Sequence, residues 1–339
     1  MVRLALMGDT MLGRMVGDAL RREPASALVA PEVVGLAQEA DLRMLNLECC
    51  ISERGERWPS SGKPFFFRAP PAAVDVLTLL GIDCVTLANN HALDYGPLAL
   101  TDTLALVHAA GIATVGAGPD RRTARAPVVL DAPGHHITVL GVTDHPSDFE
   151  ADEHQPGVAW ADLRDAVPGW LVDAITDARR LGFVLVTPHW GPNMVVEPRD
   201  YVRRAARALR EAGASLIAGH SAHVPHGVED TTLYDLGDFI DDYATDSFVR
   251  NDLSLMFLVD LERDGPRRLE AVPLKLDYCH TRLADGADAA WIKQRFRRAC
   301  RHLGTDVSEE AGRLVVTWPT ANAHADGQNR RHGRGAGRS

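Results

Sequence analysis

The sequence predicts an α/β protein with helices packed outside a sheet and further strands near the C-terminus. Two observations lead to this fold class. Short apolar runs alternate with helix-spaced segments over the first two thirds of the chain, which is typical of an α/β sheet. Beyond Leu233, strand-like segments follow one another with one helix among them. With 339 residues, 45% of them hydrophobic, the chain is long enough to bury a large core.

The first third of the chain is expected to contain three strands with helices between and after them. Two of these helices have helical apolar spacing and end at glycines, Gly81 and Gly111. Residues 52–70 are rich in Gly, Ser and Pro and are expected to form a loop. The expected strands are VRLALMG (2–8), LRMLNLE (42–48) and IDCVTLA (82–88), and the expected helices are 26–39, 71–81 and 97–111.

The middle third repeats this alternation. Each apolar run is short and bounded by Gly or Pro, as expected of a buried strand, and each intervening segment has helical spacing. The expected strands are ITVLGVTD (137–144), FVLVTPHWG (183–191) and ASLIAGHSAH (214–223), and the expected helices are 171–182 and 198–213.

The last third of the chain has a different sequence pattern, which predicts mostly antiparallel strands. We expect the segment 261–319 to complete a second sheet, so that residues 1–319 form a single domain with a motif-bearing core at 1–260. Residues 320–339 have no apolar period and are expected to be a disordered tail. The expected strands are 232–240, 253–262, 267–283 and 312–318, and the expected helix is 289–303.

Composition excludes several classes of protein. The net charge of −10 argues against a dedicated nucleic-acid binder, which usually carries a basic face. The five cysteines include no C-x-x-C pair, which argues against a disulfide framework or a cysteine zinc site. No apolar run reaches the ~18 residues of a membrane span, and no signal-peptide pattern opens the sequence, so we expect a cytoplasmic protein without a membrane span.

Side chains of metal-ligand type follow several of the predicted strands. Because ligands bind beyond the carboxyl ends of strands in α/β sheets, these side chains are expected to meet at one rim of one sheet. Asp144 and His145 also follow a strand and are candidates for the same rim. The side chains at strand ends are Asp9, Glu48, Asn90, His91, His189, His220 and His223.

The mixture of these groups favours metal binding. Imidazole suits Zn and Fe, whereas carboxylate and amide oxygens suit Mn and Mg. The set is large enough for two ions, with Glu48 or Asp9 bridging them, and two ions roughly 3.5–4 Å apart can share a hydroxide. Taken singly, Asp9 could instead cap a helix, Glu48 could lie on the surface, and His189 could be a packed core histidine. Asn90 and His91 could satisfy backbone groups of a turn.

The acidic segment LGDFIDDYATD (236–246) lies close to these candidates in sequence. Its spacing does not fit an EF-hand, and we expect a solvated loop near the mouth of the site.

Eight segments in order resemble the CapA/PgsA family, which is linked to poly-γ-glutamate capsule biosynthesis and belongs to the calcineurin-like metallophosphoesterase superfamily. The resemblance covers roughly residues 1–260, and the Asn-Asn-His-x-x-Asp-x-Gly segment is its most specific part. The segments are GDTMLGR (8–14), NLE (46–48), KPFFFRAPP (63–71), GIDCVTLANNHALDYG (81–96), AGIATVGAG (110–118), PHWG (188–191), GHSAHV (219–224) and YDLGDFI (234–240).

The resemblance implies a four-layer α/β/β/α sandwich with a dinuclear centre of two divalent transition-metal ions, such as Mn, Fe or Zn. The implied ligands are Asp9 and His223 for the first ion, Glu48 as the bridge, and Asn90, His189 and His220 for the second ion. Three positions depart from related proteins. Met11 stands where the broader phosphoesterases have histidine, Glu48 where they have aspartate, and Asp238 where the family more often has asparagine. Membrane-bound family members carry an N-terminal anchor, which we expect to be absent here.

The resemblance also implies roles around the metals. His91 would act as an acid or charge stabiliser near the leaving group, and Asp94 would orient it. The expected substrate-binding residues are Arg14, Lys63, Arg68, Asn89, Trp190 and His145. The cations among them suit the carboxylate or phosphate of an anionic small molecule or polymer.

The expected function is that of a metal-dependent hydrolase or transfer enzyme. A hydroxide held by two metals would attack a phosphoester or a γ-glutamyl-type amide. Two other functions stay open on the sequence. One is a non-catalytic, metal-binding accessory subunit for a γ-glutamyl ligase or polymer complex. The other is a soluble tailoring enzyme of a small-molecule pathway.

Overall fold

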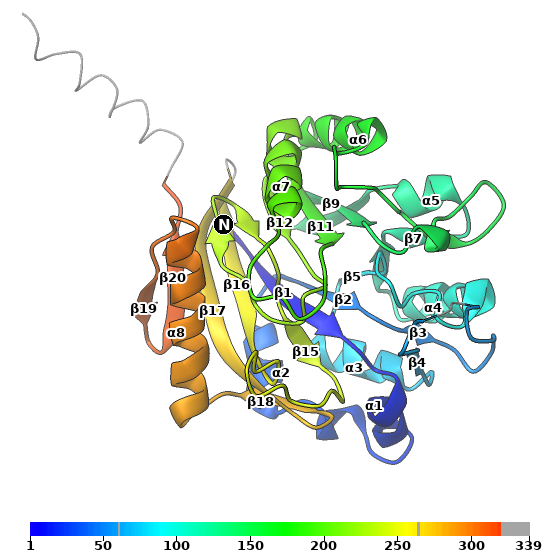
Figure 1. The fold of residues 1–339 in the computed structure, drawn as a ribbon, viewed down its shortest axis with the longest axis horizontal. Helices are drawn as coiled ribbons and strands as arrows, with labels where there is room; N and C mark the ends of the chain where they lie inside the picture. The colour runs from blue at the N-terminus through cyan, green and yellow to red at the C-terminus, as the bar shows by residue number, and fades with distance from the viewer. Residues whose placement is uncertain (60–61, 263–264, 320–339) are drawn as a thin grey trace, which may run out of the picture.

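A ten-stranded sheet forms the centre of the computed structural model, which describes residues 1–59, 62–262 and 265–319 (Figure 1). Its strand order is β19-β20-β17-β16-β1-β2-β5-β6, with β15 beside β1 and β18 beside β17. The strands are β1 (Val2–Thr10), β2 (Leu42–Leu47), β5 (Cys84–Thr86), β6 (Ala113–Val115), β15 (Asp238–Ile240), β16 (Leu253–Glu262), β17 (Gly265–Asp277), β18 (His280–Leu283), β19 (Ser308–Glu310) and β20 (Arg313–Thr317). The predicted tail, 320–339, lies outside the described residues.

A second sheet has six strands in the order β13-β14-β12-β11-β9-β8. Its central strands β9, β11, β12 and β14 run parallel, with a helix between β9 and β11 and another between β11 and β12. The strands are β8 (Val128–Ala132), β9 (His135–Thr143), β11 (Phe183–His189), β12 (Leu216–Ala218), β13 (Val228–Glu229) and β14 (Thr232–Leu233). Two small ladders pair β3 (Cys50–Ile51) with β4 (Arg68–Ala69) and β7 (Ala117–Gly118) with β10 (Gly157–Val158).

Helices cover the outer faces of the two sheets. The core that contains α1 to α4 lies on one face of the larger sheet, and the core that contains α6 and α7 lies on the outer face of the second sheet. In Figure 1, α6 and α7 are at the top and α1, α2 and α3 at the bottom, with the strands between them. The helices are α1 (Arg14–Leu20), α2 (Pro31–Ala37), α3 (Ala73–Leu80), α4 (Gly96–Ala109), α5 (Arg121–Arg125), α6 (Gly169–Arg179), α7 (Asp200–Ala212) and α8 (Gly286–His302).

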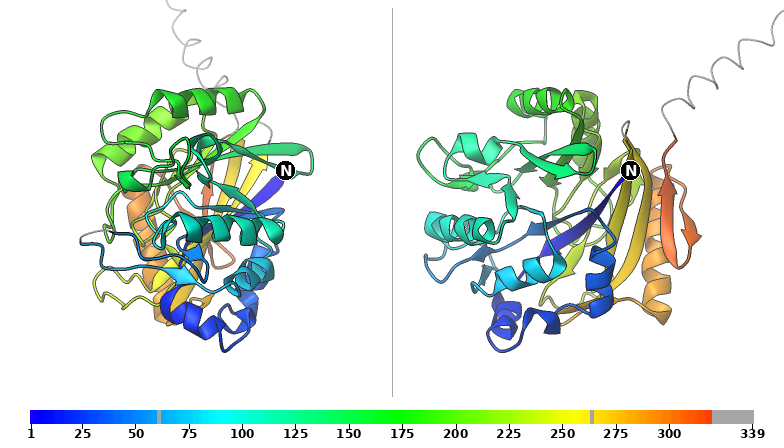
Figure 2. Two further views of the ribbon diagram at one scale, coloured as in Figure 1. Left: turned by 90° about the vertical axis from the view of Figure 1, so that its right-hand side faces the viewer. Right: turned by 180° about the vertical axis from the view of Figure 1, so that it is seen from behind.

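A third core joins the two sheets and explains the composition of their strands. In β1, Leu4 and Leu6 point into this core, whereas Ala5 and Met7 point to the helices on the other face. This period of two buries both faces of the strand, which is why residues 4–7 of β1 are all apolar. Figure 2 shows, from the side and from behind, that the second sheet (green) is drawn above the N-terminal part of the chain (blue and cyan). The fold is therefore mixed α/β with more than one sheet, as the sequence predicts.

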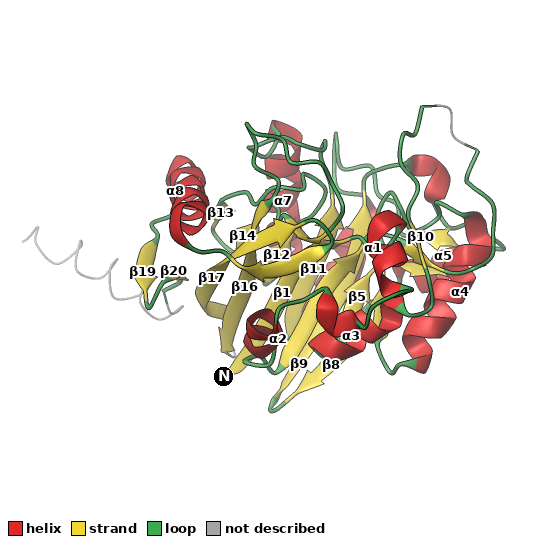
Figure 3. Cartoon of the chain, turned by 90° about the horizontal axis from the view of Figure 1, so that it is seen from below, coloured by secondary structure: helices red, strands yellow, loops and turns green. Residues whose placement is uncertain are grey.

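The prediction that the C-terminal strands complete the second sheet is wrong. β16 instead pairs antiparallel with β1, from Val2↔Leu261 to Leu6↔Phe257, and β17, β18, β19 and β20 extend the larger sheet from there. The pattern of residues 253–317 identifies strands, but it does not show which free strand edge accepts them. The view from below shows β16 and β17 beside β1 (Figure 3), and α8 packs against β16 and β17.

The predicted helix at 26–39 is also wrong in extent. A 3-10 turn at Ala25–Ala27 is followed by extended backbone, where Val29 bridges to Thr281, and α2 begins only at Pro31. Proline is favoured in the first helical turn because it has no N–H to leave unpaired. None of the described helices combines the length and apolarity that crossing a membrane requires.

Candidate metal centre

Buried polar side chains gather where the carboxyl ends of strands from both sheets meet. Asp9 lies near the end of β1 and Glu48 directly follows β2, both in the larger sheet. His189 ends β11 and His220 follows β12 in the second sheet, and a parallel bridge joins these two residues. The expectation of a rim on one sheet is therefore wrong, because the residues come from two facing sheets.

Asp9 is the most connected carboxylate of this cluster. Its Oδ1 accepts from Asn46 Nδ2 at 2.8 Å and lies 3.0 Å from His220 Nδ1. Its Oδ2 accepts from the Ser221 N–H at 3.2 Å and lies 3.4 Å from His223 Nδ1. Burial would raise the pKa of Asp9, but the contacts with these histidines hold it well below its ordinary value. Asp9 does not cap α1, whose N-cap residue is Gly13.

Glu48 is fully buried, and neither of its oxygens has a hydrogen-bond partner among the described residues. The nearest imidazole atoms are His189 Nε2 at 3.8 Å and His223 Nδ1 at 3.9 Å. Burial and the charge of Asp9 raise the pKa of Glu48 well above its usual range. A buried carboxyl without a partner is costly, and a cation would offset that cost.

The donor set fits a divalent ion. One ligand atom each from Asp9, Glu48 and His223 lies within 4.8 Å of the others. His189 Nε2 and Asn90 Oδ1 are further buried atoms without a hydrogen-bond partner in the described chain. Burial lowers the pKa of His189 well below its usual value, and the neutral imidazole is the form that binds metal.

An amide relay that the sequence analysis missed connects this cluster to the loop after β5. Asn46 donates to Asp9, and its Oδ1 accepts from Asn89 Nδ2 at 2.8 Å. Asn89 also donates to Leu47 O at 2.9 Å and accepts from the His91 N–H at 3.0 Å. Asn89 is fully buried and engaged within the protein, so it presents nothing to a substrate. The signal for Asn46 is an amide inside the apolar run LRMLNLE.

His91 and Asp94 form a buried pair. His91 Nδ1 lies 2.6 Å from Asp94 Oδ2, which also accepts from the Phe67 N–H at 2.6 Å. The His91 ring stacks on Phe67 with centroids 4.1 Å apart. Lys63 Nζ lies 2.5 Å from Asp94 Oδ1 and donates to the Asn90 carbonyl. Lys63 therefore holds this loop together.

Three of the predicted substrate-binding residues have partners inside the protein. Arg14 Nε lies 3.2 Å from Asp242 Oδ2. Arg68 donates to the carbonyls of residues 54 and 55 and lies over the Tyr95 ring at 4.1 Å. Trp190 is buried, and its indole N–H donates to the Tyr234 carbonyl at 2.9 Å. These contacts give each of the three a role in holding loops or packing the core.

The acidic segment is a solvated loop only in its later part. Asp238, Asp241 and Asp242 are buried, as is Asp235 just before the segment, whereas Asp246 is exposed. The expectation was wrong because β15 pairs with β1 and pulls the segment against the cluster.

Asp238 is the member of this segment that contacts a predicted ligand. Its Oδ1 lies 2.8 Å from His223 Nδ1, which fixes the orientation of that ring. Burial and the charge of Asp241 raise the pKa of Asp238 well above its usual range.

Comparison with known proteins gives the family of the chain. Residues 3–243 match the family described as "Bacterial capsule synthesis protein PGA_cap". The chain belongs to this family. A probable polyglutamine synthesis accessory protein of Mycobacterium tuberculosis (strain ATCC 25618 / H37Rv) is 31% identical over 303 residues, which cover 83% of this chain and 78% of that protein.

Two further matches come from other bacteria. The PGA biosynthesis protein CapA of Bacillus subtilis (strain 168) is 28% identical over 279 residues, covering 80% of this chain and 71% of that protein. A hypothetical protein from Thermus thermophilus is a solved structure with a TM-score of 0.48 and 15% identity, covering 81% of this chain and 100% of that one. The predicted resemblance to the capsule synthesis family is confirmed by its sequence matches.

An open groove of about 650 Å³ adjoins the cluster in this capsule-family chain. His145, a predicted rim residue, lies in it, and its ring is 5.3 Å from that of His189. Asn193 lies in it as well, with Nδ2 3.2 Å from His223 Nε2. The lining residues are Asp144, His145, Arg164, Gly191, Pro192, Asn193, Arg199 and Tyr201.

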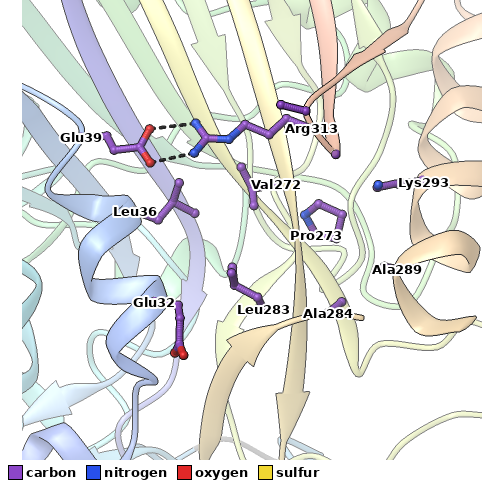
Figure 4. A pocket seen from close by; sticks show the side chains of 12 residues that line it. Glu32, Leu36, Glu39, Val272, Pro273, Leu283, Ala284, Ala289, Lys293 and Arg313 are labelled. Carbon is purple, nitrogen blue, oxygen red and sulfur yellow. Dashed lines mark hydrogen bonds and ion pairs between the residues drawn. The ribbon is translucent and has the colours of Figure 1, made fainter. Parts of the chain in front are cut away.

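Another hollow, of about 380 Å³, lies between α2, β17, β18 and α8 (Figure 4). The ion pair between Glu39 and Arg313 crosses its upper edge, with Nη2 2.7 Å from Oε1. None of the predicted site residues lines this hollow. The chemistry expected of the chain therefore belongs to the buried cluster and the groove beside it.

Proposed function

We propose that this chain is a metal-dependent hydrolase or transfer enzyme of poly-γ-glutamate metabolism, acting on a phosphoester or a γ-glutamyl-type amide. The observation that carries the proposal is Glu48, a fully buried carboxyl with two unpartnered oxygens beside Asp9 and His223. The names of the relatives, a PGA biosynthesis protein and a polyglutamine synthesis accessory protein, support the pathway. Helices outside two facing sheets are compatible with a sandwich of the metallo-dependent phosphatase type.

In this proposal the cluster holds two divalent ions. Asp9 and His223 would bind the first, Asn90, His189 and His220 the second, and Glu48 would bridge them. Such ions, when bound, would lower the pKa of a coordinated water and stabilise developing negative charge. Asn46 holds the Asp9 carboxylate in place, and Asp238 holds the His223 ring.

His91 is the proposed proton donor to the leaving group. Asp94 engages Nδ1, which leaves Nε2 as the nitrogen for the substrate. Burial lowers the pKa of His91 to about 4, so the ring is neutral at pH 7 and must take up a proton before it donates one. An anionic substrate beside Nε2 would favour that protonated form.

Elemental analysis of the purified chain tests this proposal. We expect about two transition-metal ions per chain, as in dinuclear sites, and a loss of metal in Asn90→Ala and His220→Ala. His136→Ala, which removes an exposed histidine paired with Asp131, is the matched control and should retain the metal. Hydrolysis of a chromogenic phosphoester or a γ-glutamyl anilide by the loaded wild type completes the test. A wild type that takes up no Mn, Fe or Zn contradicts the proposal.

A non-catalytic accessory role is the second candidate. The Mycobacterium relative carries the word accessory in its name, and Met11 is a buried core residue where related phosphoesterases have a histidine. A chain that binds metal but cleaves neither probe would favour this role.

A further inference from the structure

The groove beside the cluster has an unusual balance of charge. Arg164 and Arg199 line it and are exposed, and neither guanidinium has an ion-pair partner among the residues that the structure describes. The chain as a whole carries a net charge of −10, and these two arginines give the groove a local positive charge that an anionic ligand can engage.

The one carboxylate among the described residues that line the groove is already engaged. Asp144 is buried and accepts from the Tyr201 hydroxyl at 2.9 Å and from the Gly191 N–H at 3.2 Å. His145 Nδ1 contacts its other oxygen. Because its oxygens are held in this way, Asp144 does not compete for the two arginines. The Arg164 carbonyl accepts from Arg204 Nη2 at 3.2 Å, which fixes the loop that carries Arg164.

The groove is continuous with the buried cluster. His145 lies beside His189, and Asn193 contacts His223, so the inner wall of the groove borders two predicted metal ligands. Its volume of about 650 Å³ is within the range of small-molecule sites. A substrate group that reacts at the cluster would place its neighbouring units along this groove.

We infer that this groove is a binding subsite for an oligoanionic substrate, in which Arg164 and Arg199 bind the charged groups that flank the reacting bond. The inference rests on the proposed function. A guanidinium presents a planar fork of donors that matches carboxylate and phosphate groups, so either anion satisfies the chemistry. A ligand whose charges recur along its chain would supply an anionic group to each arginine.

Fluorescence anisotropy of a labelled γ-linked glutamate hexamer, with the metal-loaded full chain, tests the inference. Wild type is compared with Arg164→Gln plus Arg199→Gln and with Arg301→Gln, which removes an exposed arginine of α8 that lines no part of the groove. We expect the double variant to bind at least about tenfold more weakly, with a shallower salt dependence, as for lost charge-assisted contacts. Arg301→Gln should bind like wild type.

A labelled short linear polyphosphate is the second probe and identifies the anion, and metal content separates this test from the previous one. Binding of the polyphosphate but not of the hexamer would assign the subsite to phosphate, and the reverse result to carboxylate. Equal affinity of wild type and double variant, or no binding of either probe, would overturn the inference. If the double variant keeps its metal and binds the hexamer more weakly, the inference is supported, even when the wild type cleaves no substrate. In that case only the proposed catalysis is contradicted.

Discussion

At the scale of single residues, Asp94 is the group on which the proposed acid depends. It is fully buried, and its two oxygens receive the Phe67 N–H, His91 Nδ1 and Lys63 Nζ. The Lys63 ammonium is paired with the carboxylate, and the carboxylate selects the tautomer of His91 that carries its proton on Nδ1. The loop at residues 62–67 thus fixes the orientation of a ring on another loop.

His91→Ala should lower turnover by roughly 10²-fold or more while leaving the bound metal unchanged, since proton transfer is lost but no ligand is. Steady-state kinetics and elemental analysis on the same preparation check this. Asp94→Asn keeps the shape of the pair and should also lower turnover. Metal loss in His91→Ala as large as in His220→Ala would contradict the assignment.

His226 makes stability depend on pH. It is buried, its Nε2 donates to the Val195 carbonyl at 2.8 Å, and burial lowers its pKa to about 4. The unfolded chain takes up a proton near pH 6.5, so this contribution to stability falls as the pH drops from about 6.5 toward 4. Wild type should lose about 2 kcal/mol more than His226→Gln between pH 7 and pH 5.

Urea unfolding at the two pH values measures that difference. His136→Gln, at an exposed site, should behave like wild type. Parallel pH profiles for wild type and His226→Gln would contradict the assignment.

Part of the site could be predicted residue by residue. Asp9, Glu48 and His223 come together as expected, because the carboxyl ends of strands from the two facing sheets meet at one place. Asn46 and Asn193 were missed, since an amide in a strand or loop has many structural uses. Arg14 and Arg68 were assigned to substrate binding, but tertiary contacts that no local pattern reveals give them partners.

At the scale of elements, β1 and β15 touch backbone to backbone beside the cluster. The Asp9 N–H donates to the Gly237 carbonyl at 2.8 Å, and a Cβ added at Gly8 would lie 1.8 Å from that oxygen. Gly8 is therefore required by this close approach, which also holds Asp238 beside His223.

Gly8→Ala should destabilise the protein by about 1–3 kcal/mol or more, because the added methyl overpacks against backbone. It should also weaken metal binding, since Asp9 is its neighbour. Gly35→Ala is the matched control: it lies in α2 with nothing within 4 Å of its added Cβ, so it should be neutral or stabilising. Urea unfolding and metal titration of both variants provide the measurement, and equal stabilities would contradict the packing argument.

Most elements could be located from the sequence, because their apolar periods are strong. α3 ends where expected, at Gly81 with φ 68°, a conformation that glycine adopts freely. The helix at 26–39 could not be placed, since the bridge between Val29 and Thr281 is a contact across more than half of the chain.

At the scale of the whole molecule, the candidate site straddles two sheets that are joined by one apolar core. Leu185 of β11 is fully buried in this inter-sheet core, whereas Leu171 of α6 is fully buried in the outer core. The positions of the ligands relative to one another therefore depend more on the inter-sheet core than on the outer core.

Leu185→Ala and Leu171→Ala should each cost about 2–5 kcal/mol, the usual range for a cavity of this kind. Only Leu185→Ala should also weaken metal affinity, because it loosens the contact between the sheets. Thermal unfolding and metal titration of the two variants measure these effects. Equal loss of metal affinity in both variants would contradict the role of the inter-sheet core.

The sheet to which each strand belongs was the part that could not be predicted. Residues 253–317 form strands as expected, but they extend the larger sheet rather than the second one. A strand pattern shows a period of two, but it does not show which distant strand will pair with it. Here β16 pairs with the edge of β1 that β2 leaves free.

The placement of β1 has a consequence for the order in which the protein is made. Its neighbour β2 follows soon after it. On the other edge, β15 pairs with Asp9 and Thr10, but the longer partner, β16, begins at Leu253, beyond the family-matching stretch 3–243. At a synthesis rate of about 5–20 residues per second, this edge of β1 stays without β16 for on the order of ten seconds or more after β1 is made. An open edge recruits other strands, so the emerging chain is most vulnerable to aggregation during this interval. Ending translation after residue 243 would make that exposure permanent.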